Sequence, residues 1–462
     1  MISVIRSDFA KVLKLALLLR ERGIDVELWF DQRSHNLAQS LEEAQRLGFV
    51  CHGANKTTGK AAKRCSSSPS RRSGWMKLPI FCKRLWSEVA GCLRIIHKFG
   101  EVLVSRDIAL VIFPVASAGY NVPIYTTVCN RCHVPTLCIP FAVGDRDALA
   151  KAIQRSPKSA PDYLLNAWFL PLCQRWSLAL GDKKYLVLPA ETIIAYAIMR
   201  VEMTYPLSFY GADVGVLLLD SEYMLHHANR QQIAAFTVAI TGGMFDDDIA
   251  TAWQERTTRY QSLCRAYGWD KSRRLICLAL PPLGEAFETF RVFVDKFLPP
   301  ELDLSSWNVL VGLHPRIAAT KALEMKWPQN IRCTKDPIEL LLPMSAAFVA
   351  TYSSTIRTSV ALGIPVINYD LLNFNYDIFK EVPGVRRVAS ESEYLEVLQD
   401  FADQGPEYRR LREAIEKPEV GATYSMLDGD AERRIVGEII NAAFSSGKVV
   451  RCGESCNATS LS

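Results

Sequence analysis

The chain has 462 residues, of which 49% are hydrophobic and 22% charged, a composition typical of a soluble globular protein with an extended core. This length allows roughly two or three domains and excludes a single small module. The net charge is only +5, which gives no reason to expect nucleic acid as a partner.

The cysteine content and the first residues both indicate a reducing compartment. The 13 cysteines show no repeating spacing, and a chain of this length does not need disulfides for stability. Charged side chains interrupt any apolar region that could act as a secretory signal, among them Arg6, Asp8, Lys11 and Lys14. We therefore expect a cytoplasmic protein, with peripheral association at the inner membrane left open.

An uncharged stretch runs from Ile108 to Asn130 and is long enough to span a bilayer. Pro114, Gly119 and Pro123 interrupt it, and such residues favour a break in a spanning helix. The pattern predicts two buried strands joined by a loop.

In the first half, short apolar runs alternate with amphipathic stretches, as in βαβ units. A helix is expected over Phe9–Arg22, and strands are expected over residues 2–5, 25–30, 109–113, 134–142 and 212–222. We predict an N-terminal Rossmann-like domain over residues 1–249. Within it, residues 55–84 carry many Lys and Arg and no acidic residue, which predicts a mobile basic insertion.

The second half repeats the pattern and predicts a second Rossmann-like domain over residues 250–441, followed by a flexible tail over 442–462. Strands are expected over residues 273–283, 307–315, 330–336, 347–353 and 365–370. Helices are expected over residues 318–326, 337–345 and 355–362. The fold class is therefore α/β with two doubly wound domains.

Two polar segments follow strands of this second domain. His314-Pro315-Arg316 follows one strand, and Ser353-Ser354-Thr355 joins another strand to a helix. Ligands of such sheets bind outside the carboxyl ends of the strands, and hydroxyls with backbone N–H groups at a helix start can bind an anion. Each segment alone is typical of an ordinary helix cap or turn. Together at one sheet edge, they favour a nucleotide-phosphate site.

The segment from Val311 to Asp370 resembles the C-terminal domain of GT-B fold transferases of bacterial surface polysaccharide synthesis. In capsule sialyl- and Kdo-transferases, an HP motif precedes an SS motif by about forty residues, as His314-Pro315 precedes Ser353-Ser354 here. The segment is also similar to the glycerophosphotransferases of teichoic acid synthesis, although Thr351 and Thr358 stand where that family has Asp.

The resemblance implies a glycosyltransferase that moves a sugar from a CMP- or UDP-sugar to a surface-polysaccharide or glycolipid acceptor. It implies that His314 meets the leaving phosphate and that Ser353, Ser354, Thr355 and Arg316 bind it. The N-terminal domain would then present the acceptor, and Asp8 and Asp145 are candidates for the general base, although either could be a helix cap. No metal and no resident cofactor are expected, and an anionic membrane surface is a further candidate partner.

Three other functions stay open. A nucleotide-sugar 2-epimerase of this fold often carries a Glu shortly after the serine loop, where this chain has Arg357, Thr358 and Ser359. A glycerophosphotransferase and a non-catalytic subunit of an assembly complex are the others.

Two further signals are interpreted as structural. Asp246-Asp247-Asp248 resembles the aspartates that hold a metal in GT-A transferases, but the pattern favours capping of a helix N-terminus. His226 and His227 are adjacent and cannot face one ligand from a helix, so a solvated pair is expected.

Overall fold

The computed structural model describes residues 1–4, 9–31, 37–53, 74–141, 144, 146–281, 289–300, 302–314, 325–371, 373, 375 and 377–444. These residues form two compact units. Unit 1 comprises residues 1–219, 226–239 and those from Ile435 on, and unit 2 comprises residues 220–225 and 240–434. The division falls ten residues before the boundary expected at 249, and the last helix is assigned largely to unit 1.

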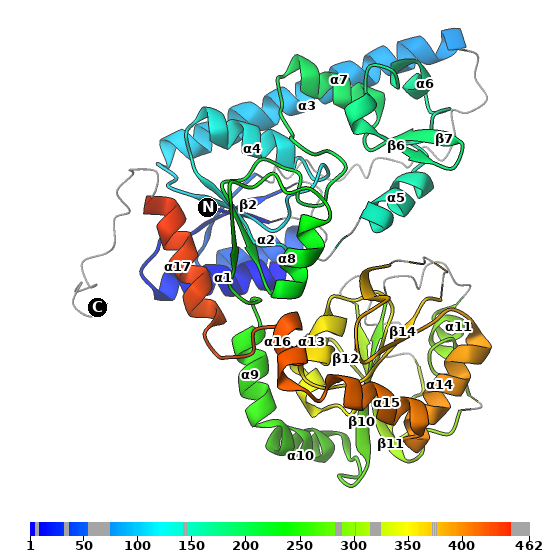
Figure 1. Cartoon of the computed structure of the whole chain (residues 1–462). Coiled ribbons are helices and arrows are strands. Elements are labelled where there is room, and N and C mark those ends of the chain that lie inside the picture. The colour runs from blue at the N-terminus through cyan, green and yellow to red at the C-terminus, as the bar shows by residue number, and fades with distance from the viewer. Residues whose placement is uncertain are drawn as a thin grey trace. The chain divides into compact units, whose positions relative to one another are not determined.

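Unit 1 is built on a seven-stranded sheet with the order β3-β2-β1-β4-β5-β8-β9 (Figure 1). Its strands are β1 (Ile2–Val4), β2 (Glu27–Phe30), β3 (Val50–His52), β4 (Val111–Phe113), β5 (Thr136–Cys138), β8 (Val216–Leu219) and β9 (Thr237–Ile240). From β3 to β8 the neighbours pair in parallel. The reversal of strand order between β1 and β4 is that of a Rossmann fold.

The helices of unit 1 include the one predicted over Phe9–Arg22 and several that the sequence pattern did not predict. They are α1 (Phe9–Glu21), α2 (Leu37–Arg46), α3 (Gly74–Ser105), α4 (Val122–Arg131), α5 (Arg146–Arg155), α6 (Asn166–Phe169), α7 (Ala190–Ile198) and α8 (Glu222–Asn229), and α17 (Ala431–Phe444) enters from unit 2. A two-stranded antiparallel hairpin, β6 (Ser177–Leu180) and β7 (Lys183–Leu186), stands apart from the main sheet.

The long helix α3 corrects the predicted basic insertion. Residues 74–84 form its first turns, whereas residues 54–73 lie outside the described part of the chain. The helix packs on α4 and α7 through buried side chains that include Phe81, Phe99 and Leu103. Because these recur at helical spacing, the basic residues between them occupy the other faces of one helix.

The uncharged stretch from Ile108 to Asn130 was predicted as two strands, and the second of these is wrong. It forms β4, a loop and helix α4. Pro123 lies in the first turn of α4, where the missing N–H of proline costs nothing. No helix among the described residues is long and apolar enough to cross a membrane.

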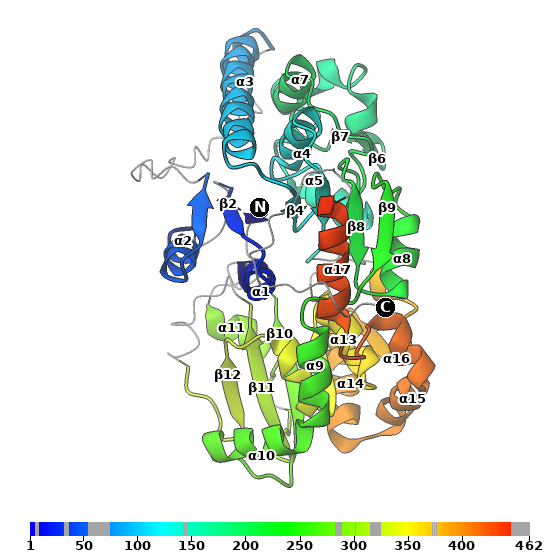
Figure 2. The same cartoon turned by 90° about the vertical axis from the view of Figure 1, so that its left-hand side faces the viewer.

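Unit 2 has a six-stranded, all-parallel sheet with the order β12-β11-β10-β13-β14-β15. Its strands are β10 (Arg274–Leu280), β11 (Trp307–Leu313), β12 (Ile331–Thr334), β13 (Ala347–Ala350), β14 (Val366–Tyr369) and β15 (Val385–Val388). The first five lie within the predicted ranges, and β15 was missed. Figure 2 shows β10, β11 and β12 side by side. The two Rossmann-like domains expected from the sequence are thus present.

Helices cover both faces of this sheet. They are α9 (Asp246–Gln254), α10 (Arg256–Tyr267), α11 (Phe290–Asp295), α13 (Thr355–Ala361), α14 (Glu391–Asp403), α15 (Pro406–Ile415) and α16 (Pro418–Tyr424). Alternate residues of β10 enter two cores: Ile276 and Leu278 pack on one face, and Leu275 and Cys277 on the other. Burial on both faces explains why the strands are continuous apolar runs.

Two of the predicted helices of this domain have another outcome. The helix expected over 337–345 is wrong, since short 3-10 turns at Ile338–Leu340 and Leu342–Met344 take its place. Most of the helix expected over 318–326 lies outside the described residues.

Candidate functional site

The carboxyl edge of the unit 2 sheet holds His314 and the serine turn, which were predicted to contact a phosphate. Strand β11 ends at Leu313, so His314 is the first residue beyond it, and its side chain is half-buried. Arg316, predicted to help bind the phosphate, lies outside the described residues.

The serine turn lies at the end of β13. Thr351 is buried and its hydroxyl donates to the Tyr369 carbonyl at 2.7 Å. The hydroxyls of Ser353 and Thr355 are 2.6 Å apart, and the Thr355 N–H donates to the Ser353 hydroxyl at 3.4 Å. Ser354 directly precedes α13 and makes no side-chain cap hydrogen bond. Ser353 therefore has the capping role that the sequence left open, whereas the Ser354 hydroxyl has none.

Tyr352 gives this turn an unusual backbone. Its φ is 47°, in the left-handed region, which a bulky residue rarely adopts. The Tyr352 N–H donates to the side-chain oxygen of Asn368 at 3.3 Å. Asn368 is fully buried in β14, and its amide nitrogen has no hydrogen-bond partner among the described residues. Residues held in this region cluster at ligand sites, where the surrounding structure fixes them.

The register of three strands aligns the two segments. Ala279 of β10 pairs with Gly312 of β11 on one side and with Ala350 of β13 on the other. His314 and Tyr352 each come two residues later, so they stand at one level of the sheet edge, separated by β10. With strands about 4.8 Å apart, their backbones are roughly 10 Å apart. Strand order reverses between β10 and β13, which is where sheets of this kind bind ligands.

The sequence did not reveal an ion pair between Arg357 of α13 and Asp220. Arg357 is buried, and its guanidinium donates to both carboxylate oxygens of Asp220, one of them at 2.7 Å. A third contact reaches the Ser221 hydroxyl at 3.4 Å. Asp220 is 137 residues earlier in the chain, and no local pattern relates the two residues.

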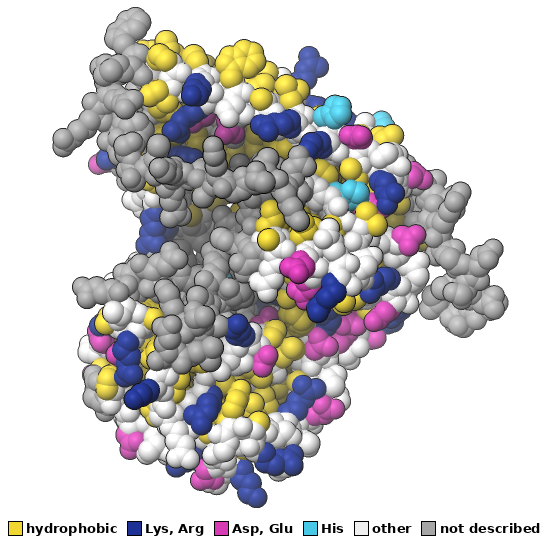
Figure 3. Space-filling view, turned by 180° about the vertical axis from the view of Figure 1, so that it is seen from behind, with side chains coloured by type: hydrophobic (Ala, Val, Ile, Leu, Met, Phe, Trp, Pro, Cys, Tyr) yellow, Lys and Arg dark blue, Asp and Glu magenta, His cyan; other side chains and the backbone are white. Residues whose placement is uncertain are grey.

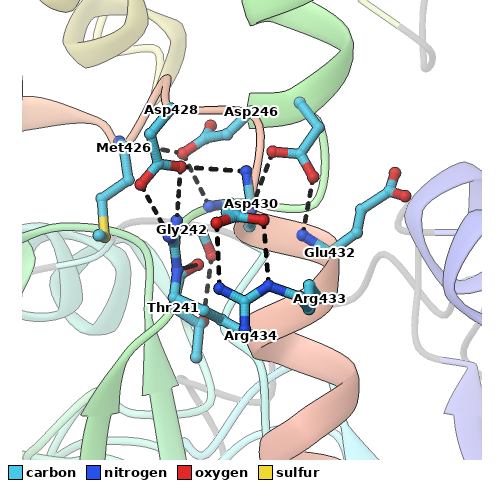
Figure 4. Close-up of polar contacts among 12 residues, drawn as sticks. Thr241, Gly242, Asp246, Met426, Asp428, Asp430, Glu432, Arg433 and Arg434 are labelled. Atoms are coloured by element: carbon cyan, nitrogen blue, oxygen red, sulfur yellow. Dashed lines mark hydrogen bonds and ion pairs between the residues drawn. The ribbon is translucent and has the colours of Figure 1, made fainter. Parts of the chain in front are cut away.

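The aspartates at the start of α9 accept from backbone N–H groups, but the expected capping of their own helix is wrong, because α9 has no side-chain cap hydrogen bond. Asp247 instead caps a different helix. Asp246 is buried and accepts from the N–H groups of Gly243 and Met426 at 2.9 and 3.2 Å. Asp247 accepts from the N–H groups of Ala431 and Glu432, both at 2.9 Å, which are the first two of α17. Figure 4 shows this cluster, in which Arg434 pairs with Asp428 and also donates to the carbonyl of Thr241 at 2.9 Å.

Among the carboxyl groups of the described residues, Asp246 has the pKa that is shifted furthest toward neutral pH. Burial, and to a smaller degree the nearby Asp220 carboxylate, raises the pKa of Asp246 to about 7. The neutral form is favoured because a buried carboxylate loses its hydration.

Neither predicted general base can be placed, because Asp8 and Asp145 lie outside the described residues. Gly144, directly before Asp145, is described. Its carbonyl accepts from Gln231 at 3.0 Å and contacts the ring of His227 at 3.3 Å. The expected solvated histidine pair is therefore only half right: His226 is exposed and lies beside Arg230, whereas His227 is half-buried against the Gly144 carbonyl.

A carboxylate that the sequence reasoning missed lies at the edge of the unit 1 sheet. Asp31 directly follows β2, is buried, and accepts from the Tyr125 hydroxyl at 2.8 Å and from the Asn121 amide at 3.0 Å. Its place after a strand was the available signal. Among the described residues, no group of three or more His, Cys, Asp or Glu side chains could hold a metal ion.

Solved structures share this architecture at low sequence identity. The sequence matches no known protein family and no curated protein. The structure is similar to the calicheamicin glycosyltransferase CalG4, with 12% identity, a TM-score of 0.52 and coverage of 96% of this chain and 98% of that one. It is also similar to the UDP-GlcNAc 2-epimerase of Neisseria meningitidis bound to UDP-GlcNAc, with 12% identity, a TM-score of 0.50 and coverage of 95% and 98%. The chain has the fold of both. At this identity the fold alone is shared, and it does not distinguish sugar transfer from epimerisation.

Proposed function

We propose that the protein is a glycosyltransferase that moves a sugar from a nucleotide-activated donor, a CMP- or UDP-sugar, to a hydroxyl of a surface-polysaccharide or glycolipid acceptor. The observation that carries the proposal is the register that aligns His314 with the Tyr352-Ser353-Ser354 turn across β10 at the reversal of strand order. The two structural neighbours are named for a sugar transfer and for a UDP-sugar conversion.

In this proposal, His314 donates a hydrogen bond or a proton to the phosphate as it leaves the sugar. Ser354 and the hydroxyls of Ser353 and Thr355 contact the same phosphate. The positive charge of Arg316 stabilises the negative charge of that phosphate. Departure of the nucleotide builds negative charge on phosphate, so preorganised donors lower the barrier by several kcal/mol. These groups take the charge without a metal or a resident cofactor. Asp8 or Asp145 would deprotonate the acceptor hydroxyl.

The epimerase stays the second candidate, because one neighbour is such an enzyme. The helix after the serine turn weighs against it. In place of a Glu this helix presents Arg357, whose guanidinium is engaged by Asp220.

The structure of the serine turn gives less support to the glycerophosphotransferase alternative. Thr351, which stands where that family has Asp, uses its hydroxyl to bond the Tyr369 carbonyl in the core. A non-catalytic assembly subunit needs no donor site.

Thermal unfolding with CMP, CDP, UDP and GDP tests the donor site. A nucleotide at about a hundred times its dissociation constant adds roughly 2.7 kcal/mol to stability, and we expect CMP or UDP to raise the melting temperature. No response to any nucleotide at saturating concentration would contradict the proposal. Sugar transfer to an added glycan acceptor supports the transferase, whereas a changed sugar epimer formed without acceptor supports the second candidate.

We also propose that the enzyme works in the cytoplasm, peripherally at the inner membrane, where lipid-linked acceptors are found, and that nucleic acid is not a partner. The basic run around residues 55–84 motivates this placement, since each Lys or Arg near an anionic surface contributes about 1 kcal/mol of attraction.

A further inference from the structure

Helix α3 carries more apolar surface than its packing uses. Phe81, Phe99 and Leu103 face the core of unit 1, but a second row of apolar side chains points to solvent. Its members are Leu78, Cys82, Trp86, Leu93 and Val104, all exposed, with Trp86 at 73% and Val104 at 72%. Steps of four, seven and eleven residues separate them, and each such step returns to the same side of a helix.

A basic row runs beside the apolar one. Lys83, Arg94 and Lys98 are exposed and are separated by eleven and four residues, so they also share one side of α3. The acidic side chains of this helix are Glu88, which is half-buried, and Glu101. From Leu78 to Val104 the two rows extend over about 39 Å of helix. Figure 3 shows hydrophobic side chains beside Lys and Arg along the upper part of this face of the molecule.

The rest of the chain differs in charge from this region. Residues 54–98 contain eleven Lys and Arg and one Glu, whereas the net charge of the whole protein is only +5. The remainder is therefore net negative, and positive charge is concentrated in this stretch of the sequence. Arg84 does not contribute to the outer row, because it turns inward to Tyr163 and Glu191.

We propose that the outer face of α3 docks on the surface of an anionic lipid bilayer. The helix lies in the plane of the membrane interface, with Trp86, Leu93 and their neighbours in the headgroup region and the basic row on anionic phosphates. This inference goes beyond the proposed sugar transfer and does not depend on it. In this inference, the side chains of a folded helix bind the membrane. Their apolar groups contribute to the binding free energy in addition to the attraction between charges.

Other occupants fit the surface less well. Nucleic acid would use the basic row, but its phosphates offer nothing to an exposed row of Trp, Leu and Val. A second copy docking by a twofold axis would use the same patch on both chains, which brings two basic rows together.

Sedimentation with vesicles tests the proposal on the full-length protein. We expect binding to phosphatidylcholine vesicles that contain phosphatidylglycerol and much weaker binding to phosphatidylcholine alone. The triple variant Lys83→Gln, Arg94→Gln, Lys98→Gln should bind anionic vesicles on the order of 100-fold more weakly, and added salt should weaken the wild type in the same way. The double variant Trp86→Ser, Leu93→Ser should bind at least about tenfold more weakly, even at low salt.

Matched controls come from other surfaces. Phe236 in unit 1 is 91% exposed, and Phe236→Ser should leave vesicle binding unchanged. Arg259, Arg265 and Lys271 are exposed in unit 2, and their joint replacement by Gln should change it far less than the α3 triple. Unchanged thermal unfolding of the α3 variants verifies that they fold.

Three results would overturn the proposal: no binding of the wild type to anionic vesicles, α3 variants that bind as tightly as the wild type, or controls that lose as much as they do. Loss of a dimer in the Trp86→Ser, Leu93→Ser variant without any vesicle binding would assign the face to a second copy. Binding of RNA or DNA that depends on Lys83, Arg94 and Lys98, without vesicle binding, would assign it to nucleic acid. A negative nucleotide panel with positive vesicle binding would reject the donor site and keep this inference.

Discussion

His314 is the residue whose replacement tests the proposed chemistry most directly. It directly follows β11 at the sheet edge, and the loss of a donor to developing negative charge costs about 10²–10³ in rate. We expect His314→Ala to lower the turnover of sugar transfer by that factor, with a smaller change in nucleotide affinity. Single-turnover kinetics and a nucleotide thermal shift measure the two effects. A folded variant with near-normal transfer would refute the role.

The two serines of the turn should separate in their effects. The Ser353 hydroxyl forms a hydrogen bond with the Thr355 hydroxyl and accepts one from the Thr355 N–H. Ser353→Ala should therefore lower the free energy of unfolding by about 1 kcal/mol and also weaken nucleotide binding. Ser354 makes no cap bond, so Ser354→Ala should weaken nucleotide binding with little loss of stability. Denaturant unfolding and nucleotide titration of both variants check this, and equal stability losses would contradict it.

Asp246 should give the protein a measurable pH dependence. Burial raises its pKa from 3.8 to about 7, so the folded state favours the neutral acid. The contribution of this group to the free energy of unfolding is fully present below its pKa in the unfolded chain, 3.8. This contribution is lost as the pH rises through about 7. Asp246→Asn keeps an acceptor for Gly243 and Met426 and removes the titration. We expect this variant to be more stable than the wild type at pH 8, by an amount on the order of a few kcal/mol, and to show a flatter profile of unfolding free energy against pH. If the variant shows the same dependence of unfolding free energy on pH as the wild type, a group other than Asp246 causes that dependence.

At the scale of elements, the start of α17 depends on a carboxylate from α9. Asp247 accepts from the N–H groups of Ala431 and Glu432, which have no partner within the helix because they belong to its first turn. We expect Asp247→Ala to lower the free energy of unfolding by about 1–2 kcal/mol. Asp247→Asn should lose less, because its amide oxygen keeps one of the two hydrogen bonds that the two carboxylate oxygens accept. Urea unfolding of both variants measures this. Equal losses in the two would show that the hydrogen bonds are not the cause.

At the scale of the whole molecule, the pair of Arg357 and Asp220 joins segments 137 residues apart within unit 2. Asp220→Ala leaves a buried guanidinium without its carboxylate, and we expect a loss of about 3 kcal/mol in unfolding free energy. The double variant Asp220→Leu, Arg357→Met removes both charges and should lose much less than Asp220→Ala alone. Denaturant unfolding of the two variants decides. A double variant no more stable than the single one would show that charge burial is not the cause.

The sequence by itself predicted two domains with parallel sheets and most of their strands, although β3, β9 and β15 were missed. Strands buried on both faces must be apolar throughout, so runs such as β10 and β11 are visible locally, and the polar residues that follow them mark the sheet edge where His314 and the serine turn lie. Helix α3 was hidden because its first turns mix basic residues with Trp and Leu, and the helical period appears only when its buried face is known.

Tertiary structure alone decided which distant groups meet. Arg357 pairs with Asp220, and Asp247 caps α17, although the two partners in each case are more than a hundred positions apart in the sequence. The burial of Asp246 depends on the packing of the elements around it. The sequence also did not show which hydroxyl of the Ser353-Ser354-Thr355 segment caps α13, and the structure gives this hydrogen bond to Ser353. That choice depends on backbone geometry, including the left-handed Tyr352 held by Asn368 of the neighbouring strand. Local patterns report local preferences, whereas these contacts exist only once the sheet has brought its strands into register.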